Sequence, residues 1–259
     1  MKKLLIVVLL MPLFAWGQSA FDGTWRLDLN KAQLPKKPDK YLLEKGTYRC
    51  DSCVPVYEVK ADGQDHKVTG HPYFDTVSVK IVDDKTVQFE QKKNGKVVGT
   101  NKQTVNDTGT QLTDEFTWQP QAGGKEQNGK AVSTRVAKGP PGSHAISGSW
   151  REEKLAGLSQ DAITWTYKTT GDGLSMKAAT GESYEAKTDG KDYPYKGDPG
   201  ITSVSLKKVN ANTLEETDKR DGKVISIAKV SISADGKTMK IDVDDKLHGT
   251  TSSYVATKQ

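Results

Sequence analysis

The chain has 259 residues, with 38 Lys and Arg against 33 Asp and Glu, 34% hydrophobic residues, 24 Gly and 2 Cys. This length allows about two domains of ordinary size, and the two cysteines exclude a small scaffold stapled by several disulfides. A charged fraction of 27%, with five Trp and nine Tyr, argues for folded cores rather than wholesale disorder.

The N-terminus has the pattern of a secretory signal peptide. Two lysines precede an apolar run from Leu4 to Trp16, and small residues follow. We predict a signal peptide over residues 1–17, cleaved after Gly17, with cleavage after Ala20 as the alternative. The short charged region is typical of bacteria, so we expect an exported protein, periplasmic or extracellular. No later stretch approaches the roughly 20 apolar residues of a membrane helix, so no membrane insertion is expected after cleavage.

The charge balance argues against a nucleic-acid partner. Removing Lys2 and Lys3 with the signal peptide lowers the formal charge from +5 to +3, and the remaining charges of both signs are interspersed. The lysines between Lys36 and Lys40 lie among prolines and are expected in a solvated loop.

Internal repetition divides the chain. Residues 57–97 align without a gap with residues 184–224, at a constant offset of 127. We predict a tandem duplication, with a first domain at 18–138, a linker at 139–145 and a second domain at 146–259. The linker holds the sequence Gly-Pro-Pro-Gly-Ser, which is typical of a chain that passes between domains.

The local signals within each half are those of strands and hairpins. Short runs rich in Val, Ile, Thr and Tyr recur, as at Tyr167–Thr170, Thr202–Val209, Val224–Ser233 and Met239–Val243. Turn dipeptides separate such runs, at Asp62-Gly63, Asn94-Gly95, Asp189-Gly190, Asp221-Gly222 and Asp235-Gly236. We expect about eight antiparallel strands per half, closed into a barrel that leaves no free edge. Residues 119–130 are expected to form a mobile hairpin loop.

The opening of each half resembles that of the calycin group, which contains the lipocalins and the fatty-acid-binding proteins. The matching residues are Gly23 with Trp25 and Gly148 with Trp150, each pair at the start of a first strand. The resemblance implies that each Trp closes one end of its barrel and that each Gly lets the entering chain pack tightly. It also implies a basic residue on the last strand, which is Arg135 in the first half.

The predicted fold class is therefore all-β, with two antiparallel up-and-down, lipocalin-like barrels in tandem. The resemblance further implies an internal cavity for a small apolar or amphipathic molecule. An eight-stranded barrel can also fill its interior with side chains. Any cavity is expected at the end opposite Trp25 in one domain and opposite Trp150 in the other.

Cys50 and Cys53 form the sharpest local motif. A redox Cys-x-x-Cys places its first thiol at a helix N-terminus, whereas the residues on both sides of this pair read as extended chain. Zinc would need a second pair of ligands, and neither His66 nor His71 has suitable spacing. In an exported protein we expect a local disulfide, with free thiols and redox or metal chemistry as the alternatives.

The sequence has no nucleophile elbow, phosphate-binding glycine loop or His-Glu-x-x-His motif. Carboxylates recur at matching positions of the two halves, in the pairs Glu58 and Glu185, Asp62 and Asp189, and Asp65 and Asp192. Turn chemistry explains the Asp pairs, and the Glu pair is expected to face solvent. No catalytic, cofactor-binding or metal-binding residue is assigned, and we do not expect an enzyme.

The sequence favours two possible functions. The first is a non-enzymatic, exported binding protein for a small hydrophobic or amphipathic ligand. The second is a structural or protein-interaction module of the cell envelope with filled β-domains and no small ligand. The sequence assigns neither ligand-binding residues nor an oligomeric state.

Overall fold

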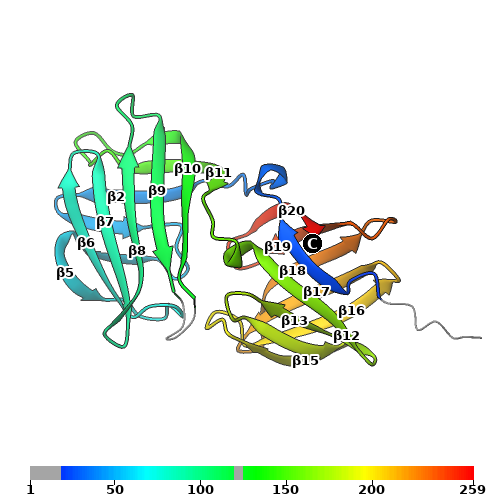
Figure 1. The fold of residues 1–259 in the computed structure, drawn as a ribbon. Helices are drawn as coiled ribbons and strands as arrows, with labels where there is room; N and C mark the ends of the chain where they lie inside the picture. Colours follow the sequence, from blue (N-terminus) through cyan, green and yellow to red (C-terminus); the bar gives the residue numbers. More distant parts are fainter. Residues whose placement is uncertain (1–18, 120–124) are drawn as a thin grey trace, which may run out of the picture.

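The computed structural model describes residues 19–119 and 125–259, so the predicted signal peptide and its cleavage site lie outside the described residues. Within the described ranges the chain forms twenty strands and two short 3-10 helices, η1 (Leu29–Lys31) and η2 (Asp161–Ile163). The strands make two ten-stranded antiparallel sheets, one closed into a barrel and one nearly closed (Figure 1).

We name the nearly closed sheet the first barrel and the closed sheet the second barrel. The first barrel contains β2 (Asp39–Glu44), β3 (Thr47–Cys50), β4 (Tyr57–Lys60), β5 (Asp62–Lys67), β6 (Thr76–Asp83), β7 (Thr86–Lys93), β8 (Lys96–Val105), β9 (Gln111–Trp118), β10 (Gln127–Lys138) and β11 (Gly148–Ala156). The second barrel contains β1 (Gly23–Leu27), β12 (Thr164–Thr170), β13 (Gly173–Ala178), β14 (Ser183–Lys187), β15 (Asp189–Lys196), β16 (Ser203–Asn210), β17 (Thr213–Arg220), β18 (Lys223–Ile232), β19 (Thr238–Asp245) and β20 (Thr250–Lys258).

Each sheet is an up-and-down meander apart from one strand, which is β11 between β10 and β2 in the first barrel and β1 between β20 and β12 in the second. The second barrel closes because β14 pairs with β15 through Ser183 with Lys196 and Tyr184 with Tyr195. In the first barrel the corresponding strands β4 and β5 are the two edges of the sheet and do not pair. The expectation of all-β antiparallel barrels is confirmed, but each barrel has ten strands rather than about eight.

The two halves of the sequence exchange their first strands between the barrels. β1 opens the first half of the sequence, yet it pairs with β12 and β20 of the second barrel. β11 opens the second half, yet it pairs with β10 and β2 of the first barrel. Figure 1 shows the dark-blue β1 next to the red β20, while the green β11 lies next to β10. The predicted domains 18–138 and 146–259 are therefore wrong at one strand each, and residues 139–145 join β10 to β11 within one sheet instead of linking two domains.

The physical reason for the exchange is that the two strands fit equivalent positions. The Trp25 Nε1 donates to the Phe21 carbonyl at 2.8 Å, and the Trp150 Nε1 donates to the Ile146 carbonyl at the same distance. Gly23 and Gly148 have φ of 130° and 129°, a region that side chains disfavour. Because each opening strand satisfies the same contacts, the local sequence does not specify which barrel receives it.

Of the five predicted turn dipeptides, three lie in connections between consecutive strands and two lie at bulges. Asp235-Gly236 lies between β18 and β19 and has positive φ only at Gly236. Asn94-Gly95 and Asp221-Gly222 have positive φ at both residues and join β7 to β8 and β17 to β18, as expected for a type I′ turn. Asp62-Gly63 and Asp189-Gly190 instead lie within β5 and β15, where the pairing register shifts. A glycine with positive φ serves a bulge as well as a turn.

The expected loop at 119–130 is shorter than predicted. Gln127–Lys130 belong to β10, and they pair with β9 from Trp118 to Glu115. Residues 120–124 lie outside the described residues.

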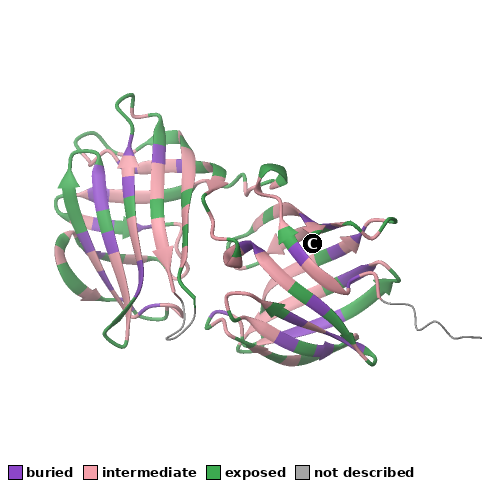
Figure 2. Cartoon of the chain, viewed as in Figure 1, coloured by how far each residue is buried: buried purple, intermediate pink, exposed green. Residues whose placement is uncertain are grey.

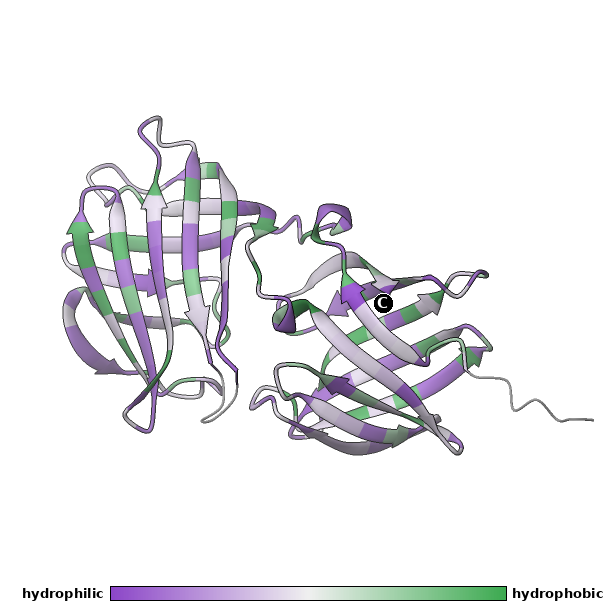
Figure 3. Ribbon diagram, in the orientation of Figure 1, coloured by the Kyte–Doolittle hydropathy of each residue, from purple (hydrophilic) through white to green (hydrophobic). Residues whose placement is uncertain are grey.

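Each barrel has its own apolar core, built by strands that alternate between buried and exposed residues (Figure 2) and between apolar and polar residues (Figure 3). The first core includes Trp150, which is 1% exposed, with Leu43, Val79 and Val87. The second includes Trp25, which is fully buried, with Leu206 and Met239.

Candidate ligand-binding cavity

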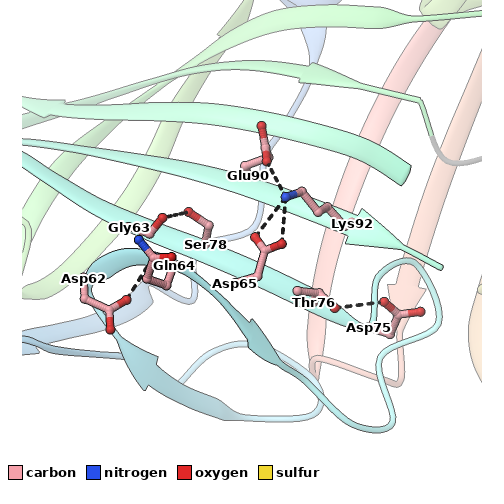
Figure 4. Close-up of polar contacts among 9 residues, drawn as sticks. All are labelled: Asp62, Gly63, Gln64, Asp65, Asp75, Thr76, Ser78, Glu90 and Lys92. Atoms are coloured by element: carbon pink, nitrogen blue, oxygen red, sulfur yellow. Dashed lines mark hydrogen bonds and ion pairs between the residues drawn. The ribbon is translucent and has the colours of Figure 1, made fainter. Parts of the chain in front are cut away.

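The carboxylates that repeat between the two halves have structural contacts. Asp65 makes an ion pair with Lys92 at 2.8 Å, and Asp192 makes the equivalent pair with Lys219 at 2.6 Å. The Asp62 carboxylate accepts a hydrogen bond from the Gln64 backbone N–H at 3.0 Å, which supports the bulge in β5 (Figure 4).

Glu58 and Glu185 are exposed, as expected. Together with the ion pairs and the bulge contact, this places the repeated carboxylates on the surface of the sheets and gives them no common site.

The predicted disulfide between Cys50 and Cys53 is confirmed, with a Cα–Cα distance of 5.4 Å. It closes the start of the loop between β3 and β4, and Cys50 is buried in the first core. Among the described residues, no three His, Cys, Asp or Glu side chains are arranged to hold a metal ion. A disulfide of this kind suggests a non-reducing environment.

The connections of an up-and-down barrel alternate between its two ends, which identifies the end away from each Trp. In the first barrel, loops 51–56 and 68–75 lie at the end opposite the start of β11, where Trp150 is found. In the second barrel, loops 197–202 and 246–249 and the turn at 221–222 lie at the end opposite the start of β1, where Trp25 is found. We call these the open ends.

A cavity of about 360 Å³ lies where the two open ends meet. The first barrel contributes Tyr41, Tyr73 and the disulfide, and the second contributes Ile201, Ile225 and Leu247. Asp39, Ser52, Asp245 and His248 add a polar side, and the same four residues also line an adjoining pocket of about 200 Å³. We call the larger space the inter-barrel cavity.

Close contacts hold the two open ends together. The Lys37 Nζ donates to the His248 carbonyl at 2.6 Å across the junction. Gly200 lies against the Tyr73 ring, and a Cβ at this position would collide with the Tyr73 hydroxyl. An ion pair also joins Lys125, which precedes β10, to Asp161 of η2 at 2.8 Å.

Three carboxyl groups gather at the open end of the first barrel. Burial raises the pKa of Asp114 to about 6, and burial together with the nearby Asp39 and Asp114 raises the pKa of Glu152 to about 7. Desolvation also raises the pKa of Asp39, against the opposing effects of Ser52, His248 and Lys37. The three side chains come from β9, β11 and β2, so the strand exchange brings Glu152 to this group.

The second barrel encloses a pair of carboxyls on β17. Burial and the neighbouring Asp218 raise the pKa of Glu216 to about 8, and the Tyr184 hydroxyl donates to the Glu216 Oε2 at 2.5 Å. The Ser226 hydroxyl donates to the Asp218 Oδ2 at 2.8 Å. Ser226 also lines the inter-barrel cavity, so this pair lies behind the wall of the cavity.

The basic residue on the last strand is present in both barrels, but only one was found from the sequence. Arg135 lies over the Trp150 ring, with its Cζ 3.8 Å from the ring centroid. The equivalent cation in the second barrel is Lys258, whose Nζ is 5.3 Å from the Trp25 centroid. Pairing each Trp with the last strand of the opposite half would have revealed this match.

A larger hollow of about 780 Å³ lies over the strands from β5 to β10. It is open to solvent, and its charged lining includes Lys80, Lys102 and Lys130 with Glu90 and Glu115. The Lys130 Nζ is 3.6 Å from the Glu115 carboxylate. Phe89 and Phe116 are the only apolar side chains among its described lining residues, whereas most small-molecule sites are enclosed and lined mainly by apolar side chains.

No protein-family model, curated protein or solved structure matches the chain. None of the helices in the described part of the chain is long and apolar enough to cross a membrane.

Proposed function

We propose that this chain is an exported, non-enzymatic binding protein of calycin-like barrels that holds a small amphipathic molecule between its two open ends. The observation that carries the proposal is the inter-barrel cavity of about 360 Å³, which has apolar and polar sides. Small-molecule sites favour concave junctions between domains, with apolar walls and a few polar groups.

The lining supports an amphipathic ligand rather than a purely apolar one. Tyr41, Ile225 and Leu247 offer apolar contact surface, while Asp39, Asp245 and other polar groups line the same cavity. An apolar molecule would bury these polar groups without replacing their hydrogen bonds to water, which is unfavourable.

Export and the calycin-like origin rest on sequence features. The signal-peptide pattern and the disulfide both favour an oxidising compartment outside the cytoplasm. The paired Gly-x-Trp openings and the repeat at an offset of 127 support a duplicated calycin-like barrel.

The test is a titration of the mature chain with Nile red, an uncharged fluorophore whose flat apolar ring system carries a polar carbonyl group. We expect saturable binding, weakened at least tenfold by Ile225→Trp, because the larger ring fills the cavity that Ile225 lines. Val224→Trp is the matched control, since Val224 is 42% exposed and does not line the cavity. Absence of saturable binding to the unaltered chain would contradict the proposal and favour a structural module.

A further inference from the structure

We propose, resting on the function above, that the ligand carries an oxyanion head group, a carboxylate or a phosphate ester, and that Arg220 and His71 bind this group at one end of the inter-barrel cavity. Both residues line the cavity, Arg220 from β17 of the second barrel and His71 from the loop between β5 and β6 of the first. The head group would therefore be held by both barrels at once.

Arg220 is a cation without a carboxylate partner. Among the described residues, no Asp or Glu forms an ion pair with its guanidinium. The Arg220 Nε donates to the Gly200 carbonyl at 2.8 Å, which anchors the side chain on its own barrel and leaves the two terminal nitrogens for another acceptor. Two N–H groups of a guanidinium match two oxygens of a carboxylate or a phosphate.

His71 supplies a further donor. Its Nδ1 accepts a hydrogen bond from the Tyr73 backbone N–H at 3.4 Å, so the neutral ring carries its proton on Nε2. Burial, followed by the positive charges of Arg220 and Lys93, lowers the pKa of His71 to about 4. The ring is therefore uncharged at neutral pH. No acidic side chain contributes to this shift, so the surroundings of His71 are electropositive and favour an anion.

Asp198 is an acidic residue near this end of the cavity, but its carboxylate has other partners. It is hydrogen-bonded to the Tyr73 hydroxyl, and its Oδ1 accepts from the Gly200 backbone N–H at 2.6 Å. These contacts hold the junction between the barrels and do not occupy the Arg220 guanidinium.

The acidic residues that line the cavity lie toward its other end. Asp39 and Asp245 also line the adjoining pocket of about 200 Å³, whereas Arg220 and His71 do not. The Asp245 carboxylate is 2.7 Å from the His248 ring. The cavity thus has donors and positive charge at one end and carboxyl groups at the other, which sets the orientation of an anionic ligand.

The remaining walls fit the apolar part of such a ligand. Ile201 and Ile225 line the cavity from the second barrel, and Tyr41 lines it from the first. The His71 ring is itself stacked on Phe74, with centroids 3.9 Å apart. A flat or short apolar group attached to the oxyanion would lie against these side chains.

The experiment compares three naphthalene derivatives as competitors for Nile red at pH 7. 2-Naphthoate and 2-naphthamide have nearly the same shape and differ in charge, and 2-naphthyl phosphate carries the other candidate head group. We expect 2-naphthoate or 2-naphthyl phosphate to bind at least tenfold more tightly than 2-naphthamide, and the tighter of the two anions identifies the head group.

Two outcomes of this competition separate the present proposal from the proposed function. If Nile red binds but neither anion is preferred over 2-naphthamide, the oxyanion proposal is overturned and the binding function stands. If Nile red itself does not bind, the proposed function fails first and the oxyanion proposal fails with it.

Charge variants test the assignment of the residues. Arg220→Gln should reduce the preference for the anion over 2-naphthamide at least fivefold, and Arg220→Lys, which keeps the charge, should retain more of the preference. His71→Phe keeps a ring to stack on Phe74 and removes the Nε2 donor, so it should reduce the preference about twofold. Circular dichroism confirms that each variant is folded.

Lys93→Gln is the matched control. Lys93 occupies the position of the first copy that is equivalent to Arg220, at the offset of 127, and it acts on His71 through its charge but does not line the cavity. Its replacement should change the preference less than twofold. An unchanged preference in Arg220→Gln, or an equally large loss in Lys93→Gln, would refute direct binding by Arg220.

Discussion

Whether an acidic side chain is buried in this protein depends on the face of the strand on which it lies. Asp114 lies two residues after the buried Leu112, so the alternation of the strand turns both side chains inward. Glu216 follows the buried Leu214 in the same way. Most acidic side chains of a protein are exposed, but those of Asp114 and Glu216 face the interior. Their pKa values rise because burial removes water from the charged form.

Glu216 should make the stability of the protein depend on pH. Its folded pKa of about 8 lies above the ordinary value of 4.5, so the folded state holds the proton more tightly than the unfolded state does. The free energy of unfolding should therefore fall as pH rises from about 4.5 to about 8. Glu216→Gln keeps an acceptor for Tyr184 and should raise the unfolding free energy at pH 9 by about 1–2 kcal/mol.

Urea denaturation at pH 6, 7, 8 and 9 measures this effect. The variant should lose part of the decline between pH 7 and 8. Asp114, with a pKa of about 6, is largely ionised in this range, and Glu152, with a pKa of about 7, still titrates there but does so in both the variant and the parent chain. Parallel curves for the variant and the parent chain would show that Glu216 does not titrate in this range.

Patterns in the sequence predicted the features formed by residues close together in the chain, but not the buried carboxyl groups that come together from distant strands. The Trp pair, the cysteine pair and the two type I′ turns depend on neighbours in sequence, so their signals are local. The group of Asp39, Asp114 and Glu152 depends on three strands that are far apart in sequence, one of them exchanged. No spacing rule connects these residues, because the strand order decides that they meet.

At the scale of elements, β1 and β11 are the two strands that belong to one half of the sequence and lie in the barrel formed mainly by the other half. Trp25 lies in the second core with Phe21, Leu206 and Met239. Trp25→Ala should therefore destabilise the second barrel by about 3–5 kcal/mol, as large-to-small core changes do, although Trp25 opens the first half of the sequence. Trp150→Ala should do the same to the first barrel.

Amide hydrogen exchange locates the damage. In Trp25→Ala, exchange should accelerate in β16–β19 and stay close to that of the parent chain in β6–β9, and the reverse should hold for Trp150→Ala. Faster exchange in β6–β9 of the Trp25 variant would mean that the strands are not exchanged in solution.

The loop between β3 and β4 is the element that the disulfide restrains. Because the bond closes a loop of only four residues, the loop-entropy relation gives a stabilisation of about 2 kcal/mol. Replacing both cysteines by serine should lower the unfolding free energy by about that amount. Intact-mass analysis after alkylation should detect no free thiol in the purified parent chain, and two alkylated cysteines without reductant would contradict the bond.

At the scale of the whole molecule, the strand exchange ties the barrels together through two connections. Residues 28–38 pass from the second barrel to the first, and residues 157–163 pass back. The sequence repeat predicted two barrels correctly but not this exchange, because repetition shows that two units are alike and does not show which copy of a strand each unit uses. The same likeness makes the two first strands interchangeable.

A fragment of residues 144–259 tests this interchangeability. It lacks β1 but retains β11, whose Gly148 and Trp150 match the backbone conformation and hydrogen bond of Gly23 and Trp25. The position between β12 and β20 would be vacant, and Trp150 could lie under Lys258 as Trp25 does. We expect the fragment to fold, with β11 in that position either within one copy or between two exchanging copies.

Light scattering distinguishes a monomer from an exchanged dimer of the fragment, and both outcomes place β11 between β12 and β20. Trp150→Ala should destabilise the fragment by about 3–5 kcal/mol, whereas in the full chain the same change acts on the other barrel. The destabilisation of the fragment and that of the first barrel in the full chain have the same cause. In both, β11 pairs with strands that accommodate its Gly148 and place a cation over its Trp150 ring. A fragment that remains unfolded, or that is insensitive to Trp150→Ala, would show that β11 cannot replace β1.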